Sequence, residues 1–134
     1  MSEKQTRDAQ IRVEIAVLKR YGLRWAVLAA WADELRTRGA ALPAALAGQL
    51  EAARVKISSG CFSSCEVGCD LSAIEAALVP ADAAGATNSV NFWLDLLGRA
   101  MEDDDAMERL LRVPAVRVHY AGCGFGRCAC GGEA

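Results

Sequence analysis

The longest hydrophobic pattern of the chain lies in its first third. From Ile11 to Ala32, apolar residues recur at alternating steps of four and three, which is the spacing of one face of an α-helix. Further apolar residues widen this face: Val17, Tyr21, Leu28, Trp31 and Leu35. A face of this width predicts a long helix that packs on more than one neighbour. Gly39 is the residue expected to close it.

Two helices are predicted on either side of the first cysteines. One begins near Pro43, because proline is tolerated in a first helical turn, and runs to Ile57 before a Ser-Ser-Gly stop. The other follows Asp70, which is a good N-cap residue, and ends at Pro80. The residues between these two helices, 61–69, are therefore predicted to form a loop.

Two further helices are predicted in the second half of the chain. The first has its cap at Asn88 or Ser89 and an apolar inward face that ends at Ala100. The second begins at the acidic run from Asp103 to Asp105, since negative charge is favourable at the start of a helix. We interpret this run as a helix cap and not as a site for a hard cation, because consecutive helix residues diverge around the axis.

The segment after Pro114 is predicted to be irregular. Val116, Val118 and Tyr120 alternate with polar residues, which favours a brief extended segment lying against the helices. Together these elements predict a mostly α, small single-domain bundle of about four to five helices over residues 1–134. The bundle is expected to carry two cysteine-rich loops, the second of them in an irregular C-terminal tail.

Length, composition and charge narrow the class of protein. The chain has 134 residues, of which 53% are hydrophobic and 24% charged. This size suits one domain with its own core, and this composition excludes a disordered chain. The 15 Lys and Arg residues nearly balance the 17 Asp and Glu residues, for a formal net charge of −2. Such a balance argues against nucleic acid or an anionic lipid surface as the partner.

No secretion signal or membrane segment is expected. Residues 1–8 are followed by no uninterrupted apolar stretch, and the longest apolar run, from Trp25 to Ala32, covers eight residues. About 20 apolar residues are needed to cross a bilayer. We therefore expect no membrane insertion and a cytoplasmic location. In a reducing cytosol, cysteines are more often metal ligands or redox-active thiols than disulfides.

The chemistry of the sequence is concentrated in its six cysteines. They form two groups, Cys61-x3-Cys65-x3-Cys69 and Cys123-x4-Cys128-x-Cys130. Glycine flanks both groups, together with serine in the first, whereas buried structural cysteines pack singly among larger apolar residues. Because glycine lets the backbone turn closely around a ligand, we predict metal-binding loops at 61–69 and 123–130.

All six cysteines are candidate ligands, and the predicted cofactor is an iron–sulfur cluster of unspecified type. Structural zinc sites favour Cys-x2-Cys pairs, and the chain contains none. A continuous helix over 61–69 would separate its outer cysteines by about 12 Å, which is too far for one zinc ion. Zinc and copper(I) are kept as alternatives, because thiolates bind both.

The sequence therefore predicts an iron–sulfur protein that transfers electrons or serves as accessory or carrier to a larger redox enzyme, with a redox protein as partner. Two alternatives stay open: a protein-interaction module stapled by zinc, and a thiol-disulfide oxidoreductase that uses Cys128 and Cys130. An enzyme in its own right is less favoured. The sequence contains no nucleophile–base arrangement, no phosphate-binding glycine loop and no histidine pair.

The single histidine, the three tryptophans and Arg127 are the remaining residues whose roles the sequence suggests. His119 is the single histidine and is interpreted as structural, with accessory metal ligation as the alternative. The three tryptophans lie on predicted helix faces and are interpreted as core residues. Arg127 stands between two cysteines, either as a counter-charge to an anionic cluster or as an exposed loop residue.

Overall fold

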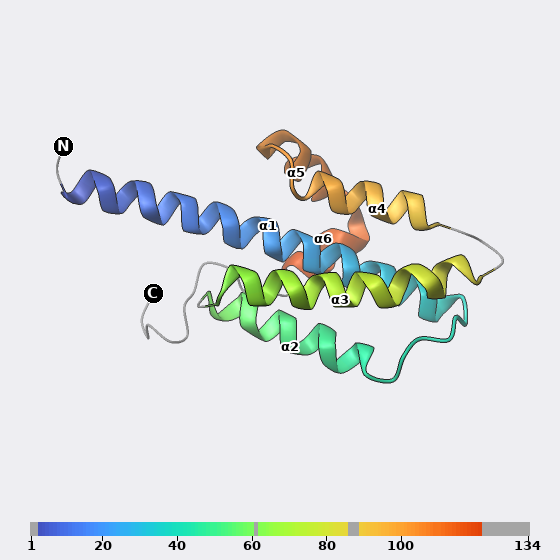
Figure 1. Ribbon diagram of the computed structural model, residues 1–134. Coiled ribbons are helices and arrows are strands. Elements are labelled where there is room, and N and C mark those ends of the chain that lie inside the picture. Colours follow the sequence, from blue (N-terminus) through green and yellow to red (C-terminus); the bar gives the residue numbers. More distant parts are fainter. Residues whose placement is uncertain (1–2, 61, 86–88, 122–134) are drawn as a thin grey trace.

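Six α-helices make up nearly all of the described chain. The structure is a computed structural model that describes residues 3–60, 62–85 and 89–121, with side chains from Val17 onward (Figure 1). The helices are α1 (Glu3–Thr37), α2 (Leu46–Ser59), α3 (Ser64–Ala83), α4 (Val90–Arg99), α5 (Asp104–Leu110) and α6 (Pro114–Ala121). Within these ranges there is no strand. The predicted small, mostly α bundle is confirmed, with six helices where four to five were expected.

α1 is the central element of the bundle. Helices α2, α3, α4 and α6 all contact it, while its N-terminal end extends beyond them (Figure 1). Between Leu23 and Ala32 every residue except Arg24 is buried. A helix segment with apolar residues all round must be covered on all sides. The wide apolar face in the sequence is thus explained by several neighbouring helices.

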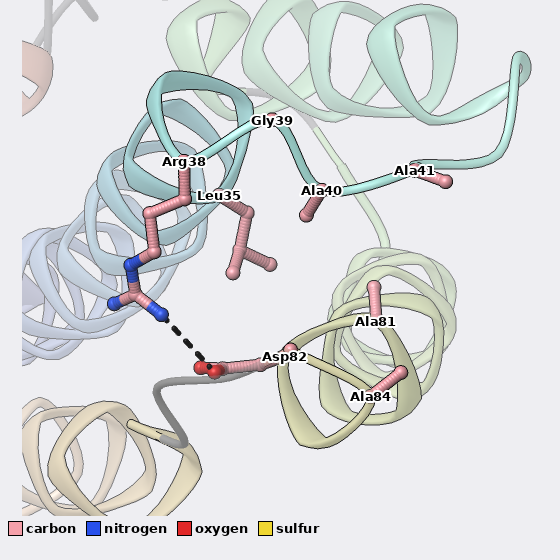
Figure 2. Close-up of a pocket in the computed structure, with 9 residues that line it drawn as sticks. Leu35, Arg38, Gly39, Ala40, Ala41, Ala81, Asp82 and Ala84 are labelled. Atoms are coloured by element: carbon pink, nitrogen blue, oxygen red, sulfur yellow. Dashed lines mark hydrogen bonds and ion pairs between the residues drawn. The ribbon is translucent and has the colours of Figure 1, made fainter.

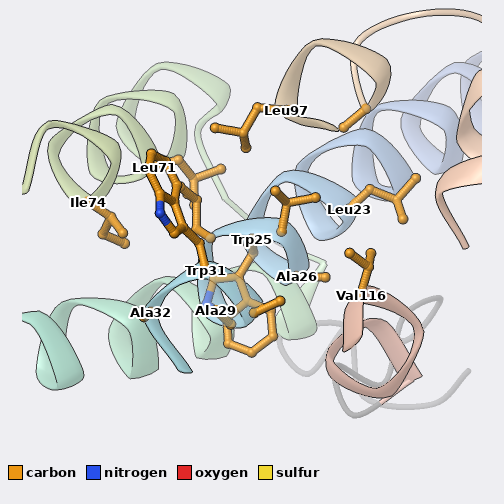
Figure 3. Close-up of a cluster of buried hydrophobic side chains, with 14 of the residues drawn as sticks. Leu23, Trp25, Ala26, Ala29, Trp31, Ala32, Leu71, Ile74, Leu97 and Val116 are labelled. Atoms are coloured by element: carbon orange, nitrogen blue, oxygen red, sulfur yellow. The ribbon is translucent and has the colours of Figure 1, made fainter. Parts of the chain in front are cut away.

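The three tryptophans belong to the core, as predicted. Trp31 is fully buried, and it stacks on Trp93 with 6.1 Å between the ring centroids and 9° between the ring planes. The indole N–H of Trp25 donates to the backbone carbonyl of Leu50 at 2.8 Å, which ties α1 to α2. Figure 3 shows the side chains of Trp25 and Trp31 surrounded by apolar residues from neighbouring helices.

A buried carboxylate joins the ends of α1 and α3 to the start of α4. Asp82 is 1% exposed. Its two oxygens accept hydrogen bonds from Trp31 Nε1 (2.8 Å), Ser89 Oγ (2.6 Å), the Ser89 backbone N–H (3.0 Å) and Arg38 Nη1 (3.4 Å). Figure 2 shows Arg38 reaching Asp82 beside a pocket of about 640 Å³.

The pKa of Asp82 reflects two opposing influences. Burial raises the pKa of the carboxyl group, but the hydrogen bonds from Ser89 and Trp31 and the charge of Arg38 lower it by more. The net result is a pKa below the ordinary value, so the group is held as a carboxylate. This carboxylate satisfies the indole N–H of a fully buried tryptophan.

The start of α3 corrects one prediction. This helix begins at Ser64 and not after Asp70, because the Ser63 hydroxyl accepts a hydrogen bond from the Glu66 backbone N–H at 3.5 Å. Serine followed three residues later by glutamate is the sequence pattern of a capping box. Residues 64–69 are therefore helical, and the loop predicted over 61–69 is wrong for them.

The end of α3 corrects a second prediction. The helix continues through Pro80 to Ala83. A proline inside a helix removes one backbone hydrogen bond, so neighbouring contacts must hold the last turn. Here Asp82 supplies those contacts through its hydrogen bonds to α1 and to Ser89.

The segment after Pro114 corrects a third prediction, because it forms α6 and not an extended strand. Proline suits the first position of a helix, where its missing N–H leaves no hydrogen bond unmade. Val116 is fully buried against the core, and Tyr120, four residues later, packs against the same core. Residues four apart share a helix face, so packing on α1 selects the helix.

The remaining boundaries follow local signals. Gly39 and Gly60 both have the positive φ, 79° and 72°, that ends a helix in the left-handed region, as expected. The Asp103 carboxylate caps α5 by accepting from the Ala106 N–H at 2.9 Å. α2 begins at Leu46, three residues later than the start predicted from Pro43. Ser89 occupies the N-cap position of α4, but its hydroxyl binds Asp82 and caps nothing.

Candidate metal centre

The structure describes two of the six predicted ligands, Cys65 and Cys69. The four others lie outside the described residues: Cys61, Cys123, Cys128 and Cys130. The predicted loop at 123–130 and Arg127 also lie outside them. The described part of the site is therefore the start of α3.

Helix geometry places the two thiols on the outer side of α3. Its buried apolar residues repeat with helical spacing and face the core: Val67, Leu71, Ile74 and Leu78. With 3.6 residues per turn, Cys65 and Cys69 lie on the opposite side of the helix, and both are exposed. Side chains four residues apart are neighbours one turn apart, with about 5–6 Å between their Cβ atoms. The structure thus brings Cys65 and Cys69 together on a solvent-facing surface.

Contacts with α1 fix one side of this cysteine-bearing turn. The Tyr21 hydroxyl donates to the Ser64 carbonyl at 3.2 Å, and the Tyr21 ring meets Phe62 edge to face at 5.7 Å. A Cβ atom at Gly68 would lie 3.8 Å from the Tyr21 hydroxyl oxygen, an ordinary van der Waals distance, so this residue faces the tyrosine. The first turns of α3 are held against α1 by these contacts.

Contacts with α2 fix the other side of the turn. Lys56 Nζ binds Glu66 Oε1 at 2.6 Å and Asp70 Oδ2 at 2.9 Å. These hydrogen bonds, the one to Glu66 first, raise the pKa of the Lys56 ammonium group. The two carboxylates adjacent in sequence to the cysteines are thus engaged by a lysine of α2. With Tyr21 on the other side, they hold the thiol-bearing turn in place without any metal.

The spacing of the two thiols favours a shared metal ion over a disulfide bond. A disulfide needs about 3.5–4.5 Å between Cβ atoms, which is less than the 5–6 Å of neighbouring helix turns. Oxidation of Cys65 with Cys69 would therefore distort α3. One metal ion with bonds of about 2.3 Å spans two sulfurs up to about 4.6 Å apart, so it can link these side chains on an intact helix. A bound thiolate here is also favoured by the positive end of the helix dipole.

The helix boundaries show that residues 61–69 are not one continuous helix. α2 ends at Ser59, Gly60 is left-handed and α3 starts at Ser64. Cys61 therefore precedes α3. A separation of about 12 Å along one helix axis does not apply to it.

Two thiols do not complete a metal site. Among the side chains that the structure describes, in residues 17–60, 62–85 and 89–121, no three His, Cys, Asp or Glu residues gather into a group able to hold a metal ion. A tetrahedral ion or an ordinary cluster takes four ligands. The Cys65–Cys69 pair could supply two of the four ligands that such a site would need.

The end of α6 lies near the same part of α1 as the start of α3. The rings of Trp25 and His119 meet edge to face with centroids 5.9 Å apart, and Tyr21, one turn earlier on α1, contacts Ser64. These two contacts join the start of α3 and the end of α6 to adjacent turns of one helix. In sequence, Cys123 is two residues beyond the last residue of α6.

His119 has the structural role that the sequence suggested. Its Nε2 lies 2.7 Å from Asp33 Oδ2, and its ring contacts Trp25. Both partners belong to α1. The imidazole thus holds α6 against the central helix.

No protein-family model, curated protein or solved structure matches this chain. In the part of the chain that the structure describes, none of the helices combines the length and the apolar character that a membrane crossing requires. Functional interpretation therefore depends on the chemistry of the site residues themselves.

Proposed function

We propose that this protein binds a metal–sulfur centre through its cysteine thiolates and carries that centre as an accessory to a redox enzyme. The centre we favour is an iron–sulfur cluster. The observation that carries the proposal is the exposed pair Cys65 and Cys69, one turn apart on a helix that is fixed on both sides. Two adjacent thiols on a fixed surface are a preorganised start for soft-metal binding.

The exposure of the two thiols favours carriage of the centre over electron transfer. Protein burial and the surrounding apolar shell control the potential of a redox centre and its access to solvent. Cys65 and Cys69 face away from the core, so two ligands of the centre would be open to a partner. Delivery would then proceed by ligand exchange. Each metal–sulfur bond that breaks is replaced by a bond to a thiolate of the acceptor, with no change in oxidation state.

The test is the metal content of the full chain purified without oxygen. We expect a brown protein that contains iron and acid-labile sulfide in comparable amounts, and lower occupancy after Cys65→Ser or Cys69→Ser. Ser72→Ala is the matched control, because Ser72 is exposed on the same side of α3 and should leave occupancy unchanged. The acceptor protein would be a redox enzyme or its scaffold with free thiolates.

Two other outcomes would overturn the proposal in different directions. Colourless protein with stoichiometric zinc would indicate an interaction module stapled by zinc. The one-turn spacing of Cys65 and Cys69 is also compatible with zinc, because a single ion can bridge the two thiolates. Metal-free protein with rapidly titrating thiols would indicate a thiol-disulfide oxidoreductase.

A further inference from the structure

We infer that Cys65 and Cys69 by themselves form a loading site, a two-thiolate site that takes up a soft metal ion before any other cysteine does. The inference rests on the proposed function and adds to it an order of ligand binding. It also names the class of ion that the pair accepts without the rest of the site: a soft ion such as Cu(I), Zn²⁺ or Cd²⁺.

The loading site exists before metal binds. Val67 and Leu71 are fully buried, so α3 is anchored by its core face in the metal-free protein. The hydrogen bond from Tyr21 and the ion pairs of Lys56 fix the first two turns from both sides. The backbone entropy of placing the two cysteines one turn apart is therefore already lost on folding, and the first ion has only to select their side-chain rotamers.

The geometry of the pair selects chelation by one ion. The two sulfurs must approach within about 4.6 Å to share an ion with bonds of about 2.3 Å, and Cβ atoms 5–6 Å apart allow this by side-chain rotation alone. Binding breaks two S–H bonds, forms two metal–sulfur bonds and releases two protons to solvent. No electron is transferred. Water fills the remaining coordination positions until further thiolates replace it.

The experiment uses the full chain with only these two cysteines left. In this variant, Cys61→Ser, Cys123→Ser, Cys128→Ser and Cys130→Ser are combined, and Cd²⁺ is titrated under reducing, oxygen-free conditions. We expect one Cd²⁺ per chain, thiolate-to-cadmium absorption in the ultraviolet, and two protons released per ion. The four replaced residues lie outside the described helices, and circular dichroism checks that the helices are retained.

A matched control moves one thiol without changing composition. Cys69→Ser with Ser72→Cys, in the same background, keeps two thiols on the exposed side of α3 but separates them by seven residues, about 10.5 Å along the axis. One ion cannot bridge that distance. We expect the control to bind Cd²⁺ at least about 100-fold more weakly, because the second thiol no longer adds chelation. Equal affinity in the two variants would overturn the inference.

The order of loading is tested on the unmodified chain. Less than one equivalent of Cd²⁺ is added, free thiols are alkylated with iodoacetamide, and the modified cysteines are identified by peptide mass spectrometry. Cys65 and Cys69 should be protected first. Earlier protection of Cys128 and Cys130 would overturn the inference even if the four-serine variant did not fold.

These results separate the loading site from the proposed function. A chain that is purified without metal, but whose two-cysteine variant binds Cd²⁺ as expected, would contradict the proposed function and support the loading site. A chain that holds an iron–sulfur cluster, but whose two-cysteine variant binds Cd²⁺ no better than its control, would support the proposed function and contradict the loading site.

Discussion

Replacing Asp82 by asparagine tests whether its carboxylate holds the ends of α1, α3 and α4 together. Asparagine has nearly the same size, so the change removes the charge and one acceptor without leaving a cavity. One of the two carboxylate positions must now carry an N–H group. That group faces either the indole N–H of Trp31, or the Ser89 N–H and Arg38.

The expected cost follows from these donors. Trp31 is 0% exposed, so its N–H has no access to water, and an unpaired buried donor costs about 1–3 kcal/mol. Loss of the charge weakens the remaining hydrogen bonds, and those to charged groups contribute about 1.5–3 kcal/mol each. We expect Asp82→Asn to lower the free energy of unfolding by about 3 kcal/mol. For a domain of this size that lowers Tm by roughly 10 °C.

The effect should depend on pH in one direction. Asp82 has a lowered pKa in the folded state, so its ionisation stabilises the fold fully above the unfolded-state pKa, about 4. That contribution is lost as the pH falls through the lower, folded-state pKa. The stability difference between the unmodified chain and Asp82→Asn should therefore be constant from pH 7 to pH 5 and should shrink below about pH 4.

Urea unfolding, followed by circular dichroism at several pH values, measures this difference. Asp95→Asn is the matched control, because the Asp95 side chain is 62% exposed and pairs with Arg99, one turn away on α4. Such a pair contributes at most about 0.5 kcal/mol. The reasoning is refuted if Asp82→Asn is no more destabilising than Asp95→Asn, or if its effect does not change below pH 4.

Two smaller changes test local features of the fold by the same unfolding assay. Gly39→Ala should cost about 1–2 kcal/mol, because Gly39 has a φ of 79°. Gly48→Ala, within α2, should instead stabilise the protein by about 0.5–1 kcal/mol. At both positions, no atom of a described residue beyond the local backbone lies within 4 Å of the added Cβ, so equal effects of the two changes would contradict the conformational explanation. Asp103→Ala removes the cap bond to the Ala106 N–H and should cost about 1 kcal/mol, whereas no change would show that water replaces the cap.

Local signals in the sequence were sufficient where one physical effect dominates. The long apolar face from Ile11 predicts α1, and glycine's access to positive φ predicts the helix ends at Gly39 and Gly60. The start of α3 was missed although its signal is also local. Ser63 and Glu66 have the sequence spacing of a capping box, and the Ser63 hydroxyl accepts from the Glu66 N–H, but they stand among the glycine and cysteine residues that favoured a loop.

Other features were missed because distant residues determine them. The alternating pattern over 116–120 fits a strand as well as a helix, and only packing on α1 decides between them. Trp31 and Asp82 are 51 residues apart, so no local pattern reveals their hydrogen bond. The cysteine spacing predicted metal chemistry, but only the placement of α3 shows that Cys65 and Cys69 share an exposed side.

The central position of α1 has a consequence for synthesis of the protein on the ribosome. The buried stretch of α1 is translated early, yet Asp33 and its partner His119 on α6 are 86 residues apart. At about 5–20 residues per second, the ribosome needs roughly 4–17 s to add that length. During this interval the apolar surface that α6 covers is open to other proteins.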